Sequence, residues 1–203
     1  MGAQASLLKN YVVNIVMFNV YQEPVVIKNF ISHEDCDFLM KFEPEKFKES
    51  GILQQNNDTL NSNIRKSRQK VHNHESHEII MNVLNKCSKI AKKSISFFER
   101  IHIVHYKPGG FFKPHKDGDE AGHNRIYSFL IYLNDDYEGG ETNFPLLNKS
   151  YKLDKGDALF FHNYNTNFSN TSLSTHEGCI VKNGEKWVAN VWIHPHSIER
   201  LLD

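Results

Sequence analysis

The spacing of apolar residues divides the chain into a helical part and a strand-rich part. From Ser76, apolar residues recur at three- and four-residue steps as far as Phe98, which predicts an amphipathic helix of about five turns. Further upstream, 24–30 has the composition of a strand. Ser32 is a residue type favoured at helix N-caps, and it predicts a shorter helix over 34–42.

The periodicity changes after Glu99, where short aromatic and β-branched segments alternate with glycine-containing turns. The polar stretch 45–75 is expected to be a long loop that holds one or two short strands. Helices followed by many short strands favour an α+β fold whose second half is a double-sheet barrel or jelly roll. The strands of that half are expected at 100–106, 127–133, 158–161, 179–181 and 187–193.

The length suggests one domain with an N-terminal extension, because 203 residues exceed the usual domain size of about 150 only modestly. We expect an extension over 1–22, a supporting region of helix and strand over 23–98, a jelly roll over 99–196 and a tail over 197–203. Hydrophobic residues make up only 39% of the chain, but its 14 Phe and 8 Tyr supply enough apolar surface for one core.

Charge and cysteine content bear on partners and compartment. Lys+Arg and Asp+Glu both number 24, and this neutral balance removes the electrostatic argument for a dedicated nucleic-acid binder. Three cysteines are an odd and sparse set, which argues against a disulfide scaffold and favours a reducing compartment. We therefore expect no nucleic-acid partner and a cytoplasmic or membrane-associated protein, with the secretory pathway less favoured.

The N-terminus offers a candidate membrane signal. Gly2 and Ser6 fit the Met-Gly-x-x-x-Ser/Thr pattern of N-myristoylation, and a chance match is the alternative. A single acyl chain gives only weak, reversible membrane attachment. The apolar run at 11–18 is shorter than the roughly 20 residues that span a bilayer, but it could add a second contact.

The segment His115-Lys-Asp117 is the first candidate for chemistry. Side chains two positions apart in a strand share a face, so His115 and Asp117 could bind one metal ion together. Two imidazoles and one carboxylate form the facial triad of non-haem Fe(II) oxygenases, and His176, at the entry to a late strand, is the candidate for the second imidazole. By itself the pattern is weak, because the chain has 12 histidines.

A lysine and a tyrosine suggest an anionic cosubstrate. A lysine inside a barrel is costly unless its charge is paired. A dicarboxylate would pair with Lys186 at one end and chelate the metal at the other, and Tyr106 could donate its hydroxyl to the same distal carboxylate. A metal-assisted hydrolase could use the same three metal ligands, but it would not need Lys186.

The loop between His176 and Lys186 tests this arrangement. If Asn183-Gly184 closed a two-residue hairpin, the two side chains would face opposite sides of the sheet. Both must face inward for the site to form. We therefore expect an odd-length loop or a β-bulge near Gly178 or Gly184.

These residues belong to a longer ordered string. The string comprises Tyr106, Gly109-Gly110, His115-Lys-Asp117, Arg125, Tyr132-Leu-Asn134, Gly139-Gly-Glu-Thr142, Lys155-Gly-Asp-Ala-Leu-Phe-Phe161, His176-Glu-Gly-Cys179 and Gly184-Glu-Lys-Trp187. It resembles the prolyl 4-hydroxylase branch of the Fe(II)- and 2-oxoglutarate-dependent dioxygenases. The match is specific from about 99 to 196 and extends weakly upstream, over 24–42 and Arg65-Lys-Ser67.

The resemblance implies a double-stranded β-helix (jelly-roll) core with flanking N-terminal helices, and it implies a role for each matching residue. His115, Asp117 and His176 would hold Fe(II), and Lys186 would bind the 5-carboxylate of 2-oxoglutarate. The residues that would bind or line the cosubstrate are Lys186, Tyr106, Trp192 and Thr142.

The implied activity is hydroxylation of a peptidyl proline. Fe(II), 2-oxoglutarate and O2 would take part, ascorbate would serve as reductant, and succinate and CO2 would be released. The partner would be a proline-containing peptide or protein. Two alternatives stay open: hydroxylation of another protein side chain, and a catalytically inactive jelly-roll module with a binding or structural role.

Overall fold

The computed structural model describes residues 20–54, 57–59, 61–118 and 124–198. Among these residues, no helix is both long enough and apolar enough to cross a membrane. The candidate acylation motif at Gly2, the apolar run at 11–18 and the end of the tail, 199–203, lie outside the described residues.

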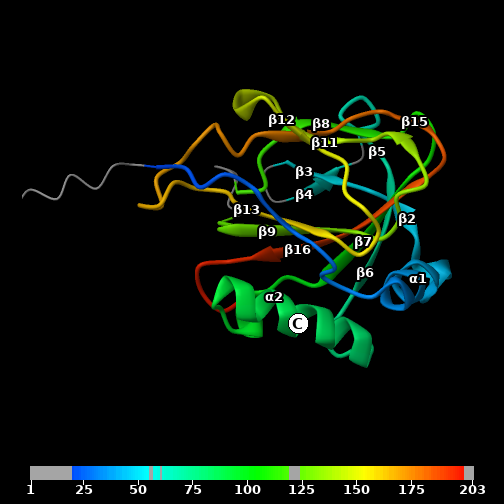
Figure 1. Cartoon of the computed structure of the whole chain (residues 1–203), viewed down its shortest axis with the longest axis horizontal. Coiled ribbons are helices and arrows are strands. Elements are labelled where there is room, and N and C mark those ends of the chain that lie inside the picture. The colour runs from blue at the N-terminus through cyan, green and yellow to red at the C-terminus, as the bar shows by residue number, and fades with distance from the viewer. Residues whose placement is uncertain (1–19, 55–56, 60, 119–123, 199–203) are drawn as a thin grey trace, which may run out of the picture.

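Two antiparallel sheets face each other and form the predicted jelly roll (Figure 1). The larger sheet has the order β1 (Val25–Ile27), β13 (Ala158–His162), β9 (Tyr127–Tyr132), β16 (Lys186–Ile193), β7 (Ile101–Tyr106), β6 (Arg68–His72) and β2 (Lys48–Glu49). The smaller sheet has the order β12 (Lys149–Tyr151), β11 (Thr142–Phe144), β14 (His176–Gly178), β8 (Phe111–His115) and β5 (Arg65–Lys66). Two short pairs join β10 (Glu138–Gly139) to β15 (Val181–Asn183) and β3 (Ile52–Gln54) to β4 (Asn57–Thr59).

The central strand β16 shows how the larger sheet serves two purposes. Its side chains point alternately to the two faces, as the pleat of a strand requires. Ala189, Val191 and Ile193 belong to the hydrophobic core beneath the helices. The alternate positions, Lys186, Val188, Asn190 and Trp192, line a pocket between the two sheets.

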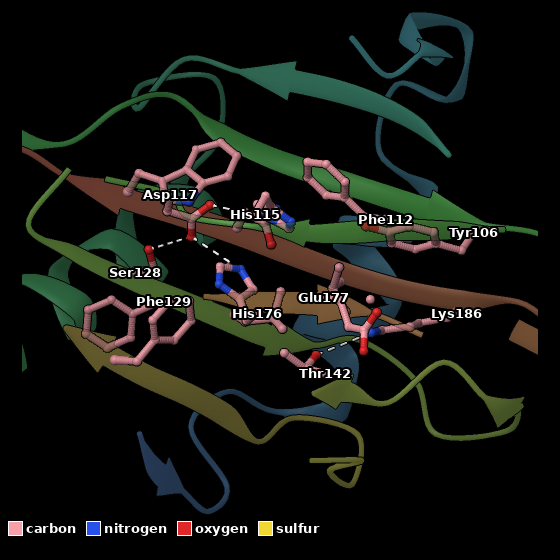
Figure 2. Close-up of a pocket in the computed structure, with 16 residues that line it drawn as sticks. Tyr106, Phe112, His115, Asp117, Ser128, Phe129, Thr142, His176, Glu177 and Lys186 are labelled. Carbon is pink, nitrogen blue, oxygen red and sulfur yellow. Dashed lines mark hydrogen bonds and ion pairs between the residues drawn. The ribbon is translucent and has the colours of Figure 1, made fainter. Parts of the chain in front are cut away.

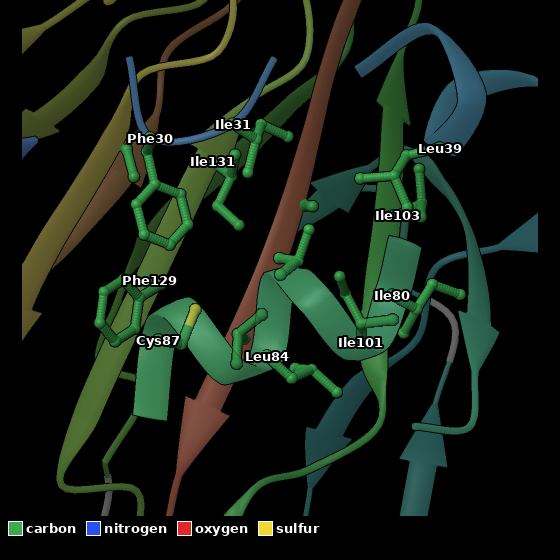
Figure 3. Packing of buried hydrophobic residues seen from close by; sticks show 14 of the residues in the cluster. Phe30, Ile31, Leu39, Ile80, Leu84, Cys87, Ile101, Ile103, Phe129 and Ile131 are labelled. Atoms are coloured by element: carbon green, nitrogen blue, oxygen red, sulfur yellow. The ribbon is translucent and has the colours of Figure 1, made fainter. Parts of the chain in front are cut away.

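The helices cover the outer face of the larger sheet (Figure 1). The helix α1 (His33–Lys41) begins where the Ser32 hydroxyl accepts a hydrogen bond of 3.0 Å from the Asp35 amide, so the predicted cap is present. The longer α2 (Glu78–Ala91) buries its apolar stripe against strands β7, β9 and β16 (Figure 3). Three short 3-10 helices, η1 (Pro44–Lys46), η2 (Ile95–Phe97) and η3 (Pro145–Leu147), lie in connections.

The helix predicted to continue to Phe98 ends earlier than its apolar spacing suggested. Lys92 adopts the left-handed conformation, with φ of 51°, and its amide bonds to Ser88. The chain then makes η2, and Phe98 pairs with Ile193 as an isolated β-bridge. The apolar residues after Ala91 therefore serve the junction with the sheet and do not extend the helix.

Two strand predictions were wrong. The stretch 45–75 holds five strands, β2 to β6, where one or two were expected. Four residues of β6 are polar, and the strand forms because its backbone pairs with β7 along its whole length. The strand expected at 179–181 does not form, because the chain leaves the smaller sheet after Gly178 and pairs with β10 only from Val181 onward.

Candidate metal and cosubstrate site

The pocket between the sheets has an empty volume of about 480 Å³, which includes space open to solvent. Figure 2 shows its two ends: the imidazoles of His115 and His176 with the Asp117 carboxylate at one, and Lys186 with Thr142 at the other. The structure therefore places all these predicted residues around one cavity.

The three candidate metal ligands converge from two paired strands and the segment after one of them. His115 ends β8, and His176, which begins β14, is its cross-strand partner. Asp117 lies two residues beyond the end of β8, so the premise that it shares a strand with His115 was wrong. The Nε2 atoms of both histidines lie 3.8 Å from the Asp117 carboxylate, and the three ligand atoms all lie within 4.8 Å of one another.

Backbone carbonyls fix the tautomers of the two histidines. His115 Nδ1 lies 2.8 Å from the Lys113 carbonyl oxygen, and His176 Nδ1 lies 3.0 Å from that of Ser174. A carbonyl oxygen only accepts hydrogen bonds, so each Nδ1 must carry the proton. Each Nε2 is then left with its lone pair directed at the centre of the triad, as metal-bound histidines require.

Two polar residues that the sequence did not single out orient Asp117. The Ser128 hydroxyl donates to Asp117 Oδ2 over 2.7 Å, and the Asn163 amide donates to Ser128 Oγ over 2.9 Å. Asn163 is fully buried. No local pattern marks either residue, because a lone serine or asparagine among strand residues carries no sequence signal.

The charge states of the triad suit a divalent cation. Burial, and then the neighbouring His176, hold the pKa of the His115 imidazole well below its usual value. Burial alone would raise the pKa of the Asp117 carboxyl, but the adjacent imidazoles hold it below its ordinary value. A neutral imidazole beside an ionised carboxylate is the donor set that metal binding needs. The residues present therefore fit Fe(II), and the set matches the facial triad.

Lys186 is a buried cation that pairs with no carboxylate among the described residues. Its side chain is nearly inaccessible, and Nζ donates to the Gly140 carbonyl over 2.7 Å and approaches the Thr142 hydroxyl at 3.5 Å. Burial lowers the pKa of the ammonium to about 8. A carboxylate ligand entering the pocket would relieve this cost by supplying the missing negative charge.

Tyr106 and Thr142 lie at the same end as Lys186. Tyr106 is the cross-strand partner of Lys186, and the ammonium lies 5.6 Å from the centre of its ring. The Thr142 hydroxyl accepts a hydrogen bond of 2.8 Å from Tyr132. Together these side chains form a polar end wall that could receive a carboxylate.

Trp192 lines the same pocket at the metal end. Its cross-strand partner is Ser128, the residue that bonds Asp117. The Arg125 guanidinium lies 3.9 Å from the centre of the indole. It forms a bidentate ion pair with the Glu99 carboxylate, with N–O distances of 2.5 and 2.7 Å. Trp192 is therefore a pocket wall near the triad and does not contact Lys186.

The structure also explains how His176 and Lys186 both face inward. The pairing of β14 with β8 shifts register between His176 and Gly178, so the expected irregularity near Gly178 is present. The two residues, however, do not belong to one hairpin: β14 lies in the smaller sheet and β16 in the larger. The chain crosses between the sheets through β15 before Lys186.

Comparison with known proteins agrees with the metal and cosubstrate site that the geometry indicates. Residues 101–194 match the family model described as the 2OG-Fe(II) oxygenase superfamily. The chain is 31% identical to probable prolyl 4-hydroxylase 7 of Arabidopsis thaliana, over 87% of this chain and 64% of that protein. It is 30% identical to a putative prolyl 4-hydroxylase of Acanthamoeba polyphaga mimivirus, over 85% of this chain and 74% of that protein.

A solved structure shares both fold and sequence with the chain. The viral collagen prolyl hydroxylase vCPH of Paramecium Bursaria Chlorella virus-1, crystallised as a 2OG complex, superposes with a TM-score of 0.66 and 28% sequence identity. The superposition covers 85% of this chain and 96% of the viral protein. The similarity therefore extends beyond the pocket to the β1–α2 region that supports it.

Proposed function

The chain belongs to the prolyl 4-hydroxylase-like 2OG-Fe(II) oxygenases, and from that membership we propose that it hydroxylates proline residues of a peptide or protein substrate. The reaction consumes O2 and 2-oxoglutarate and releases succinate and CO2. The observation that carries the proposal is the pairing, in one pocket, of an intact triad with a buried lysine that has no carboxylate partner in the described structure.

The residues of the chain divide the work between the two ends of the pocket. His115, Asp117 and His176 would hold Fe(II), which when bound supplies the activation of O2 that the protein alone cannot perform. Lys186 would bind the distal carboxylate of 2-oxoglutarate. The aromatic walls keep the reaction away from bulk water, and the Ser128 hydroxyl holds the Asp117 carboxylate in its ligating position.

The relatives favour proline over the alternatives. The curated relatives described above are named prolyl 4-hydroxylases, and the viral structure is a collagen prolyl hydroxylase. Hydroxylation of another side chain has no such support. An inactive module is not favoured, because the three ligands, their backbone partners and the orienting Ser128 are all in place.

Two steps test the proposal. First, anaerobic addition of Fe(II) and 2-oxoglutarate is expected to give a weak visible charge-transfer band, and His115→Ala should abolish it. His33→Ala, a matched control at an exposed position, should leave the band unchanged.

Second, a proline-rich peptide should gain 16 Da in a reaction that depends on 2-oxoglutarate. Succinate formation with another substrate, and none with any proline peptide, would reassign the substrate class.

We further propose ascorbate as the reductant that maintains Fe(II) between turnovers, because Fe(II) is readily oxidised. Repeated turnover should decline sooner without ascorbate, whereas the first turnover should not change.

Weak membrane attachment through Gly2, and a cytoplasmic or membrane-associated location, are likewise proposals that rest on the sequence pattern. Incorporation of a tagged myristate into the wild-type chain and not into Gly2→Ala would support them.

A further inference from the structure

Asn190 is a polar residue of the pocket that belongs neither to the triad nor to the Lys186 end. It lies on β16 and lines the pocket together with Val188 and Trp192. Its side-chain oxygen, Oδ1, is buried and has no hydrogen-bond partner among the described residues. A buried polar atom without a partner lowers the stability of a fold, so such atoms are rare and usually have another role.

The neighbouring strands supply no partner for this carboxamide. In an antiparallel sheet, residues directly opposite each other direct their side chains to the same face. The residues opposite Asn190 are Leu130 on β9 and His102 on β7. Leu130 has no polar side-chain atom, and Nδ1 of His102 is itself buried without a partner. Packing within the sheet therefore does not explain a carboxamide at this position.

Strand pairing places Asn190 beyond the Lys186 ammonium along β16. The ammonium lies 5.6 Å from the ring centre of Tyr106, which is the partner of Lys186 itself, and 5.4 Å from that of Tyr132. Tyr132 is the cross-strand partner of Val188. The Lys186 side chain therefore extends along the strand toward the level of Val188, and Asn190 is the next inward-facing position.

Trp192 marks the level of the metal ligands on the same strand. Its cross-strand partner is Ser128, whose hydroxyl donates to Asp117 over 2.7 Å. Asn190 is thus the inward-facing position between Val188 and Trp192, about 7 Å along the strand from each. A ligand that joined the ammonium to the triad would pass in front of the Asn190 carboxamide, on the triad side of the ammonium.

We propose that the Asn190 carboxamide donates a hydrogen bond to the 2-oxo acid end of 2-oxoglutarate, the end that chelates the metal. This inference rests on the proposed function. A carboxamide has two N–H donors and one acceptor, and rotation about its last side-chain bond presents either group. The 2-oxo acid end carries a carboxylate and an oxo group, which only accept hydrogen bonds. Asn190 would orient this end, and Lys186 would hold the other.

The polypeptide substrate is the competing partner. Its backbone N–H groups could donate to Asn190 Oδ1 without any rotation of the carboxamide. The two partners make opposite demands, because the cosubstrate needs a donor at Asn190 and the peptide needs an acceptor.

Anaerobic titration of the full-length, Fe(II)-loaded protein with 2-oxoglutarate tests the proposal through the charge-transfer band. Asn190→Leu is similar in size and forms no hydrogen bond. It should raise the dissociation constant about 10- to 100-fold, the loss usual for a hydrogen bond to a charged group. It should also shift the band, which reports the electronic state of the chelating group. Lys186→Met should weaken binding without a shift, and Asn82→Leu, at an exposed position of α2, should change neither value.

Asn190→Asp keeps the shape of the side chain and separates the two partners. An added carboxylate beside the 2-oxo acid end should weaken 2-oxoglutarate binding more than Asn190→Leu does, because like charges repel. If Oδ1 accepted from a peptide N–H group, Asn190→Asp would leave the 2-oxoglutarate dissociation constant unchanged, and Asn190→Leu would raise only the KM of the peptide.

That second pattern would overturn the inference while the proposed function stands. So would a weaker dissociation constant in Asn190→Leu with no shift of the band, which would assign the effect to packing. The thermal midpoint of Asn190→Leu should not fall, since an apolar side chain replaces an unpaired polar one. A wild-type protein that gave no band with Fe(II) and 2-oxoglutarate would overturn the proposed function, and this inference with it.

Discussion

Lys186 is the residue whose chemistry is most closely tied to the ligand. Its ammonium is buried between Gly140 and Thr142 without a carboxylate partner in the described structure. Such a group is costly without a paired charge and favourable beside an anion, because attraction between charges is strong where water is excluded. Lys186 therefore lowers the folding stability of the protein and raises its affinity for an anionic ligand.

Replacing Lys186 by Met tests both effects, on folding stability and on ligand affinity. The variant should keep or gain folding stability, by up to about 1–3 kcal/mol, because the buried charge is gone. Its affinity for 2-oxoglutarate should fall at least about 30-fold, the loss expected for one buried charge pair. Denaturant unfolding and a 2-oxoglutarate titration measure the two quantities. Lys152→Met, at an exposed lysine, is the control and should retain affinity. A strongly destabilised variant with normal affinity would contradict this role.

The pH dependence of cosubstrate binding follows from the same residue. The pKa of Lys186 is lowered to about 8 by burial, and only the ammonium form attracts a carboxylate. Affinity for 2-oxoglutarate should therefore fall about tenfold between pH 7 and pH 9. Lys186→Arg stays charged and should lose this dependence. A constant affinity in the wild-type protein across that range would argue against Lys186 as the binding group.

Folding stability should change in the opposite direction over the same window. The folded-state pKa lies below the unfolded value of 10.5, so between about pH 8 and 10.5 the unfolded chain binds more protons at this site. The contribution of Lys186 to the free energy of unfolding therefore rises with pH in that range. The difference between wild-type and Lys186→Met stability, measured at pH 7 and pH 10, isolates this contribution.

Ser128 tests whether an orienting residue affects metal binding. Its hydroxyl donates to Asp117 and accepts from Asn163, so Ser128→Ala leaves the carboxylate without its buried partner. Iron affinity should fall about 10- to 100-fold, as is usual when a residue behind a metal ligand is lost. Ser150→Ala, at an exposed position of β12, serves as the control in the same metal titration. Equal affinities in both variants would show that Asp117 needs no orientation.

At the scale of elements, the sequence predicted best those strands and helices whose apolar spacing matches the face that they bury in the fold. The strands β7, β9, β13 and β16 were predicted within a residue or two, because each has an apolar face against a core. The end of α2 was not, because Ile95 and Phe98 keep helical spacing while packing at the junction with the sheet. The polar β6 was missed because backbone pairing with β7, and not side-chain pattern, makes it a strand.

The residues of the site also divide into those that a local sequence pattern marks and those that none marks. The triad and Lys186 could be predicted because each stands in a motif of recognisable spacing. Ser128 and Asn163 could not, since their role arises only when β9 and the segment after β13 meet near Asp117. The sequence also predicted the irregularity near Gly178, but not that the segment from His176 to Lys186 crosses from one sheet to the other.

The helix α2 should contribute to stability and not to chemistry. Leu84 is fully buried in the core between α2 and the larger sheet, on the side away from the pocket. Leu84→Ala should lower the free energy of unfolding by about 2–5 kcal/mol through lost burial and a cavity. The KM for 2-oxoglutarate should not change below the unfolding transition. Asn85→Ala, on the exposed face, is the control. A changed KM would show coupling between the helix layer and the pocket.

At the scale of the whole molecule, the larger sheet separates two environments. One face packs on the helices and holds most of the apolar core, and the other packs on the smaller sheet and encloses the polar pocket. This separation lets costly groups such as Lys186 and Asp117 be buried, because the opposite face supplies stability. The viral hydroxylase shares this fold at 28% identity.

We propose that one O2 molecule is divided between 2-oxoglutarate and a proline side chain in this pocket. Reaction with a proline-rich peptide under oxygen-18 gas tests it in a single mass measurement. We expect one labelled atom in hydroxyproline and one in succinate, with the two products formed in equal amounts. Labelled succinate with an unmodified peptide, or hydroxyproline whose oxygen comes from water, would contradict the account.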